Sequence, residues 1–208
     1  MDELMDEKLG ILTTGLRHWR KEEATLYNRM ESTPYHHLDE LFKHYTINKN
    51  DSLIDFGAGR GRVLFYTHYQ HDIPVYGVEL HDLTFDELED NKKFYLKRSK
   101  SQSPVVLEYG YADSYEIDKD DTICFFFNPF CLSIFKGVVQ NIIQSLKDYE
   151  RQLDIILYYP EKSFKRYLEK NTPFKLYQVI RIPNKKDKRR KFVVYRYEPN
   201  ESKVEESI

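Results

Sequence analysis

Residues 53–66, LIDFGAGRGRVLFY, constrain the fold more than any other part of this sequence. An apolar run reaches Asp55, three glycines follow at Gly57, Gly59 and Gly61, and a helical pattern begins directly afterwards. Glycines at alternate positions let the backbone pass close to a ligand, and the N-terminus of the helix behind them offers unpaired N–H groups. The segment therefore predicts a strand, a ligand-binding loop and a helix. An acidic residue two positions before the first glycine favours a ligand with an ammonium or hydroxyl group over a pyrophosphate.

Apolar runs and helical patterns alternate along the rest of the chain. Strands are expected at 75–80, 105–109, 122–127 and 153–159, and helices at 62–70, 84–100, 132–150 and 161–170. This alternation predicts a parallel sheet with right-handed crossovers. The runs 174–182 and 192–197 are joined by a polar turn without a helix, so they predict a hairpin.

Two further motifs fall at the ends of predicted strands. Glu79 ends the second run, 22 residues after Gly57, where a ribose-binding carboxylate is expected in a Rossmann-like unit. The fourth run ends in Asn128, Pro129 and Phe130, which should face the same crevice as the glycine loop. As alternatives, the glycines form a tight turn, Glu79 is a solvated strand end, and Asn-Pro is an ordinary turn.

These features resemble the class I S-adenosylmethionine-dependent methyltransferases, because DFGAGRG at 55–61 matches their DxGxGxG signature. The resemblance covers residues 51–198. It implies an α/β fold with a Rossmann-like, doubly wound, mostly parallel seven-stranded sheet, an antiparallel C-terminal hairpin strand and N-terminal helices. It also implies S-adenosyl-L-methionine as the cofactor.

The same resemblance implies roles for individual residues. Asp55 would hold the methionine amino group, Glu79 the ribose, and Asp113, after the third strand, the adenine. Asn128, Pro129 and Phe130 are similar to the (Asn/Asp/Ser)-Pro-Pro-(Tyr/Phe) motif of amino methyltransferases, with one proline in place of two, and are the implied catalytic residues. The implied cofactor-binding residues are Asp55, Phe56, Gly57, Gly59, Gly61, Glu79, Leu80, Ala112, Asp113 and Asn128.

The expected function is therefore methyl transfer to a nucleophile, with an amine nitrogen of a nucleobase or protein side chain favoured. A small-molecule N- or O-methyltransferase and a cofactor-binding module without catalysis remain open. An NAD-dependent oxidoreductase is disfavoured by Asp55 and by GxGxG spacing where dinucleotide sites have GxGxxG.

The net charge of −2 gives no whole-chain attraction to a polyanion. A local basic run near the predicted hairpin turn could contact nucleic-acid phosphates, or could simply decorate an exposed turn. Its cations are Lys185, Lys186, Lys188, Arg189, Arg190 and Lys191.

Other chemistry is not expected. Cys124 and Cys131 form neither a disulfide framework nor a metal-ligand spacing, and the seven histidines do not converge with other ligands, so we predict no metal. No apolar run approaches the ~18 residues of a membrane helix, and we predict a cytoplasmic protein without a membrane partner.

The ends of the chain are expected to lie outside the core domain. Residues 1–50 predict a helical extension packed on the core, with loosely spaced leucines on one helical face and a second helix near 35–45. Tyr27 and Tyr35 should pack at the sheet edge or cap the cofactor. Residues 199–208 predict a flexible acidic tail.

Overall fold

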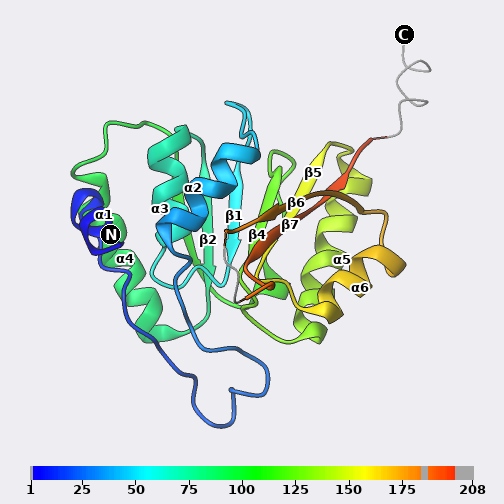
Figure 1. The fold of residues 1–208 in the computed structure, drawn as a ribbon, viewed down its shortest axis with the longest axis horizontal. Helices are drawn as coiled ribbons and strands as arrows, with labels where there is room; N and C mark the ends of the chain where they lie inside the picture. Colours follow the sequence, from blue (N-terminus) through cyan, green and yellow to red (C-terminus); the bar gives the residue numbers. More distant parts are fainter. Residues whose placement is uncertain (1, 184–186, 200–208) are drawn as a thin grey trace.

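One seven-stranded sheet with helices on both faces organises the chain (Figure 1). The computed structural model describes residues 2–183 and 187–199. The strand order is β3-β2-β1-β4-β5-β7-β6. β7 runs antiparallel to both β5 and β6, and the other neighbouring pairs are parallel. The predicted Rossmann-like α/β fold with an antiparallel C-terminal hairpin strand is confirmed. The strands are β1 Leu53–Phe56, β2 Val75–Glu79, β3 Val105–Tyr109, β4 Ile123–Phe126, β5 Leu153–Tyr158, β6 Lys175–Arg181 and β7 Lys191–Tyr197.

The helices after residue 50 also lie where the sequence predicted them. The largest shift is at the end of α4, which stops at Leu96, because the N–H groups of Arg98 and Ser99 both turn back to the carbonyl of Tyr95. The helices are α1 Asp2–Leu9, α2 Tyr35–His44, α3 Arg62–His71, α4 Asp82–Leu96, α5 Leu132–Asp148 and α6 Lys162–Asn171, with a short 3₁₀ helix, η1, at Ala112–Ser114.

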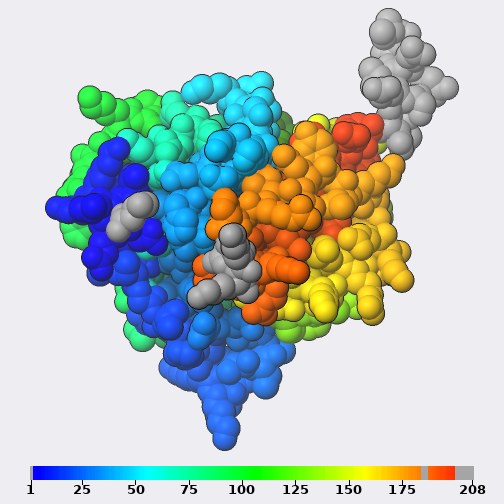
Figure 2. Space-filling model, viewed as in Figure 1, coloured from blue at the N-terminus to red at the C-terminus, as the bar shows by residue number. Residues whose placement is uncertain are grey.

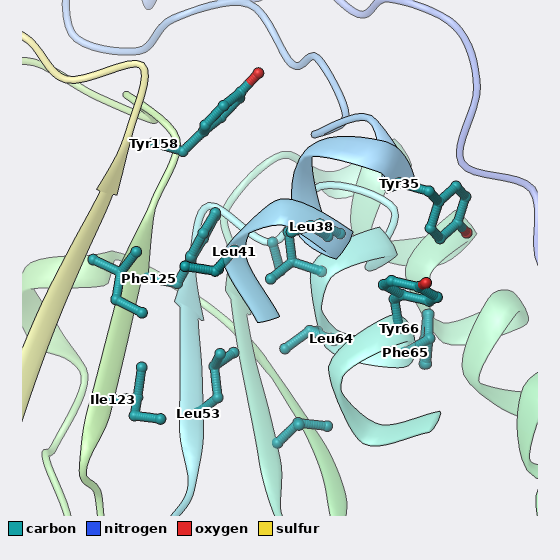
Figure 3. Packing of buried hydrophobic residues seen from close by; sticks show 14 of the residues in the cluster. Tyr35, Leu38, Leu41, Leu53, Leu64, Phe65, Tyr66, Ile123, Phe125 and Tyr158 are labelled. Carbon is teal, nitrogen blue, oxygen red and sulfur yellow. The ribbon is translucent and has the colours of Figure 1, made fainter. Parts of the chain in front are cut away.

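Each face of the sheet carries its own apolar core. Successive residues of a strand point to opposite faces. In β4, Ile123 and Phe125 therefore pack with α1 to α4, whereas Cys124 and Phe126 pack with α5 and α6. Figure 3 shows the first of these cores between the sheet and α2 and α3.

The predicted N-terminal helix is wrong for residues 10–34. Helix α1 stops at Leu9, since Gly10 is left-handed with φ 74° and the N–H of Ile11 returns to the carbonyl of Asp6. The spaced leucines form no apolar face, because most of them are exposed. Those exposed are Leu4, Leu12, Leu16 and Leu26. Segment 10–34 instead forms the long blue loop of Figure 1 and the blue protrusion of Figure 2.

A buried polar cluster anchors the start of this segment to α3. The Arg62 guanidinium donates to Thr13 Oγ1 at 2.7 Å and to Asp2 at 2.8 Å, and lies 4.6 Å from the ring centre of Tyr35. The Asp6 carboxylate accepts hydrogen bonds from Thr13 and, at 2.5 Å, from the Tyr35 hydroxyl. Tyr35 therefore packs on this cluster and does not line the pocket described below.

Removing the hydrogen bond between Tyr35 and Asp6 from this cluster should measurably destabilise the fold. A hydrogen bond to a charged group contributes about 1.5–3 kcal/mol, and Tyr35 is 2% exposed. We expect Tyr35→Phe to lower the free energy of unfolding by that amount in urea titrations. Tyr109→Phe is the matched control, because Tyr109 is 55% exposed and should change stability by less than about 0.5 kcal/mol. Equal effects of the two changes would contradict the anchoring role.

Some sequence predictions fall on residues that the structure does not describe. Lys185 and Lys186 of the basic run lie outside the described residues, and so do residues 200–208 of the predicted tail. Across residues 2–183 and 187–199, every helix is too short or too polar to span a bilayer.

Candidate functional site

A pocket lies at the carboxyl ends of β1, β2 and β4, where the strand order reverses. Ligands of open α/β sheets bind at this position. The lining residues come from two parts of the chain, the strand ends with their loops and the N-terminal segment 17–33. The pocket thus brings together residues that are far apart in sequence.

Asp55 places a buried carboxylate in this pocket. It lies in β1, opposite Gly77 of β2 and Phe125 of β4, and is 4% exposed. In the described part of the chain, the carboxylate has no hydrogen-bond donor. Burial raises the pKa of Asp55 well above its ordinary value, and the Glu79 carboxylate raises it further. A cationic or hydroxyl-bearing ligand would supply the partner that the protein does not.

Three backbone N–H groups hold the Glu79 carboxylate at the end of β2. Oε2 accepts from Gly59 at 2.8 Å, and Oε1 accepts from Leu80 at 3.0 Å and from His81 at 2.8 Å. Burial raises the pKa of Glu79, and these hydrogen bonds lower it in part. Each carboxylate oxygen has two acceptor sites, so Oε2 keeps one for a ligand hydroxyl.

Two of the glycines lie close to side chains from other segments at the pocket. Gly57 is left-handed with φ 79°, and a Cβ there would lie 2.4 Å from Cβ of Pro129. Gly59 has φ 56°, and its Cβ would lie 3.1 Å from the Met30 side chain. The glycine loop is therefore in contact with the Asn-Pro-Phe turn on one side and with the N-terminal segment on the other.

Gly61 and Phe56 were predicted to bind the cofactor but lie outside the pocket lining. Gly61 precedes α3 with φ 86°, and its missing side chain makes room for Phe65, at 2.4 Å from an added Cβ. Phe56 is fully buried and stacks on Phe126 at 5.0 Å. Successive side chains of β1 point to opposite faces of the sheet. Because Asp55 points toward the pocket, Phe56 points into the core on the other face.

Leu80 and Ala112 line the pocket, whereas Asp113 does not. The 3₁₀ turn of η1 buries Ala112 and leaves the Asp113 side chain exposed. Asp113 lies beside Gly137 of α5, and its carbonyl accepts a hydrogen bond from Asn141. The structure does not bring Asp113 together with Asp55, and its contact with adenine remains a prediction.

The Asn-Pro-Phe turn closes one side of the pocket. Pro129 and Phe130 line it, and Phe130 is 3% exposed. Asn128 has φ 43°, and its Nδ2 donates to the carbonyl of Tyr159 at 2.5 Å. Within the described residues, Oδ1 of Asn128 has no partner. Asn128 lines a neighbouring cavity and does not line this pocket. The preceding residue, Phe127, lines both the pocket and the neighbouring cavity.

Sequence reasoning missed the contribution of residues 17–33. Trp19 stacks on Tyr27 at 4.5 Å, contacts the His81 ring at 5.0 Å and donates to the carbonyl of Asn28 at 2.9 Å. Tyr27 lines the pocket, which is a position from which it could cap a cofactor, the second of the two roles predicted for it. No motif marks these residues. The available signal was the pair Gly10 and Gly15, both left-handed here, which interrupts the helical pattern.

Ion pairs hold this segment over the glycine loop. Glu87 of α4 accepts from Arg17 at 2.5 Å and from Arg60 at 2.7 Å, and Arg60 also donates to the carbonyls of Thr14 and Gly15. The cavity that remains has a volume of about 80 Å³. Small-molecule sites usually measure ~300–1,000 Å³, and an outward shift of segment 17–33 would enlarge this cavity toward that size.

Metal ligation has no visible basis in the described ranges, where no three His, Cys, Asp or Glu side chains lie together in a suitable group.

Comparisons with solved structures show which fold this is. An RNA methyltransferase from Salinibacter ruber, solved with S-adenosyl-L-homocysteine, is 16% identical, with 82% of this chain and 95% of that chain covered and a TM-score of 0.56. The human methyltransferase 10 domain containing protein is 14% identical, with 95% and 93% covered and a TM-score of 0.57. A Pyrococcus abyssi tRNA (uracil-54, C5)-methyltransferase, also solved with S-adenosyl-L-homocysteine, is 11% identical, with 80% and 39% covered and a TM-score of 0.55.

No protein-family model matches the chain, and no curated protein sequence does. At these identities the structural likeness establishes a shared fold, namely the seven-stranded Rossmann-like fold that these methyltransferases have.

Proposed function

We propose that this protein is an S-adenosylmethionine-dependent methyltransferase that transfers a methyl group to an amine nitrogen. The observation that carries the proposal is the pair of buried carboxylates, Asp55 and Glu79, at the ends of adjacent parallel strands beside a left-handed glycine loop. Proteins of the same fold that were solved with S-adenosyl-L-homocysteine support it.

The acceptor groups of the pocket fit this cofactor. The unpartnered Asp55 carboxylate suits the ammonium group of the methionine moiety, and the free acceptor site of Glu79 suits a ribose hydroxyl. A dinucleotide fits poorly, because a buried carboxylate beside the glycine loop would repel the pyrophosphate that such loops otherwise hold.

The protein's part in the reaction is to position and to exclude water. When bound, S-adenosylmethionine supplies a methyl group on a positively charged sulfur, which an in-line nucleophile can displace. Phe127 forms a wall between this pocket and the neighbouring cavity. The free Oδ1 of Asn128 would accept a hydrogen bond from the acceptor amine and orient its lone pair.

Trp19 gives a direct test of cofactor binding, because it is the only tryptophan of the chain and lines the pocket. We expect binding to shift segment 17–33 and so to change the stacking of Trp19 on Tyr27. We expect S-adenosylmethionine and S-adenosylhomocysteine each to change the tryptophan fluorescence saturably, and NAD to leave it unchanged.

Trp19→Phe is the control for this titration. It should remove the optical signal while calorimetry still detects S-adenosylhomocysteine. Binding of NAD without S-adenosylmethionine, by either method, would refute the proposed function. Formation of S-adenosylhomocysteine only when an acceptor is present would then separate an enzyme from a binding module.

A further inference from the structure

A second cavity adjoins the cofactor pocket on the far side of the Asn-Pro-Phe turn. Its volume is about 620 Å³, and the two cavities share Asn28, Arg29, Glu31 and Phe127. It opens between the start of α2 and residues 187–190, the part of the β6–β7 hairpin that precedes β7. In Figure 2 the orange surface of this hairpin lies beside the blue surface of α2, and Gln178 donates to the carbonyl of His44. An acceptor in this cavity would lie next to the proposed methyl donor.

Two strained residues shape the floor of this cavity. Asn128 follows β4 with φ 43°, and Tyr159 follows β5 with φ 51°, and the two are hydrogen bonded to each other. A left-handed conformation is a genuine outlier for a bulky residue such as tyrosine, and such strain concentrates at functional sites. Among the described non-glycine residues, only Asp72 shares it.

The walls of the cavity are aromatic. Phe127 contacts Tyr158 edge-on at 4.6 Å, and Tyr159 is half-buried beside them. The Tyr159 hydroxyl donates to Asp187 at 2.7 Å, and the Arg189 guanidinium lies 4.6 Å from its ring centre. The Tyr159 ring is therefore held in place and can stack against a flat ligand.

The rim of the cavity carries exposed cations. The Arg29, Arg189 and Arg190 side chains are 56%, 69% and 44% exposed. Residues 187–191 hold four cations against one carboxylate, a net charge of +3.

Uncharged and acidic groups complete the lining. Burial lowers the pKa of His37 to about 4, so its imidazole is uncharged at neutral pH. The carboxylates of Glu31, Glu161 and Asp187 also border the cavity, and Glu31 and Asp187 are paired with its arginines. Aromatic walls with an arginine rim match the two features of single-stranded nucleic acid, stacked bases and phosphates.

We propose that this cavity binds one base of a single-stranded nucleic acid, stacked on Tyr159 with its amine toward Asn128, while the rim arginines contact the flanking phosphates. This inference rests on the proposed function and names its acceptor. A nucleobase is favoured over a protein amine, because a flat base can stack on the Tyr159 ring and a lysine side chain cannot.

The test uses fluorescein-labelled 20-nucleotide single-stranded RNA, and DNA of the same sequence, in anisotropy titrations with the 208-residue protein. We expect saturable binding of at least one strand, and the comparison identifies which sugar is preferred. Tyr159→Ala should weaken binding about 5- to 150-fold, and Tyr159→Phe, which keeps the ring, should restore it.

Charge removal gives a second readout. The double change Arg189→Gln with Arg190→Gln should make the salt-dependence slope shallower by about 1.4, at ~0.7 per phosphate contact. Lys97→Gln with Lys100→Gln removes the same charge from exposed residues after α4, at the amino edge of the strands, and should leave the slope unchanged.

The outcomes separate this inference from the proposed function. Binding of S-adenosylhomocysteine without binding of either strand, or strand binding that survives both cavity variants, overturns the inference alone. Methyl transfer to poly-L-lysine without strand binding also overturns it. Strand binding that falls in the cavity variants, without any S-adenosylhomocysteine binding, supports the cavity assignment and refutes the proposed function.

Discussion

Asp55→Asn is expected to weaken binding of S-adenosylhomocysteine about 30-fold or more. Removing one partner of a buried charge pair costs about 2–5 kcal/mol, and each 1.4 kcal/mol is a factor of ten. Asp55 is buried and has no donor in the described protein, so the ligand ammonium would be its main partner. Isothermal titration of both proteins measures the difference.

The same change should stabilise the protein without ligand. Burial and Glu79 raise the pKa of Asp55 in the folded state, so the folded chain holds this proton more tightly than the unfolded chain does. The stability that the group contributes is present below the ordinary aspartate pKa of about 3.9 and is lost as pH rises through the raised value. At neutral pH the buried carboxyl group is therefore a net cost to the stability of the fold, and asparagine removes that cost.

We therefore expect Asp55→Asn to raise the melting temperature at pH 7, by about 2–4 °C per kcal/mol gained. The gain should shrink as pH falls toward the ordinary aspartate pKa of about 3.9, and wild-type affinity for S-adenosylhomocysteine should weaken as protons compete with the ligand ammonium for the Asp55 carboxylate. Asp86→Asn, an exposed change on α4, should alter neither property. Unchanged affinity in Asp55→Asn would contradict the geometry proposed for the ammonium group.

Gly57→Ala is expected to damage both folding and the pocket. An added Cβ would lie 2.4 Å from Cβ of Pro129, whose ring cannot rotate away, at a φ of 79°. Left-handed strain costs about 1–3 kcal/mol and overpacking about 1–3 kcal/mol more. We expect a loss of about 2–6 kcal/mol in urea unfolding, and loss of S-adenosylhomocysteine binding at temperatures where the variant stays folded.

Gly110→Ala is the matched control, because Gly110 also lines the pocket but an added Cβ there meets no atom within 4 Å. Its unfolding free energy should change by less than about 0.5 kcal/mol. A similar loss in both variants would mean that general glycine entropy, and not the contact with Pro129, explains the result.

Sequence patterns predicted the strands and helices after residue 50 well because these patterns are local. Apolar runs such as 122–127 and the helical patterns between them depend on neighbouring residues, and together they imply a parallel sheet. Asp55, Gly57 and Glu79 were located by their spacing along one strand–loop–helix–strand unit. That unit leaves little freedom, so all three meet at the pocket.

The sequence alone thus determined the sheet, the glycine loop and the two carboxylates, because strand periodicity and short loops specify them locally. Only the tertiary structure decided the path of segment 10–34, the exclusion of Asp113 from the pocket and the contact between Asn128 and Tyr159. The physical reason is that these features depend on packing between residues far apart in the chain. No local pattern records which distant side chain will fill a given space.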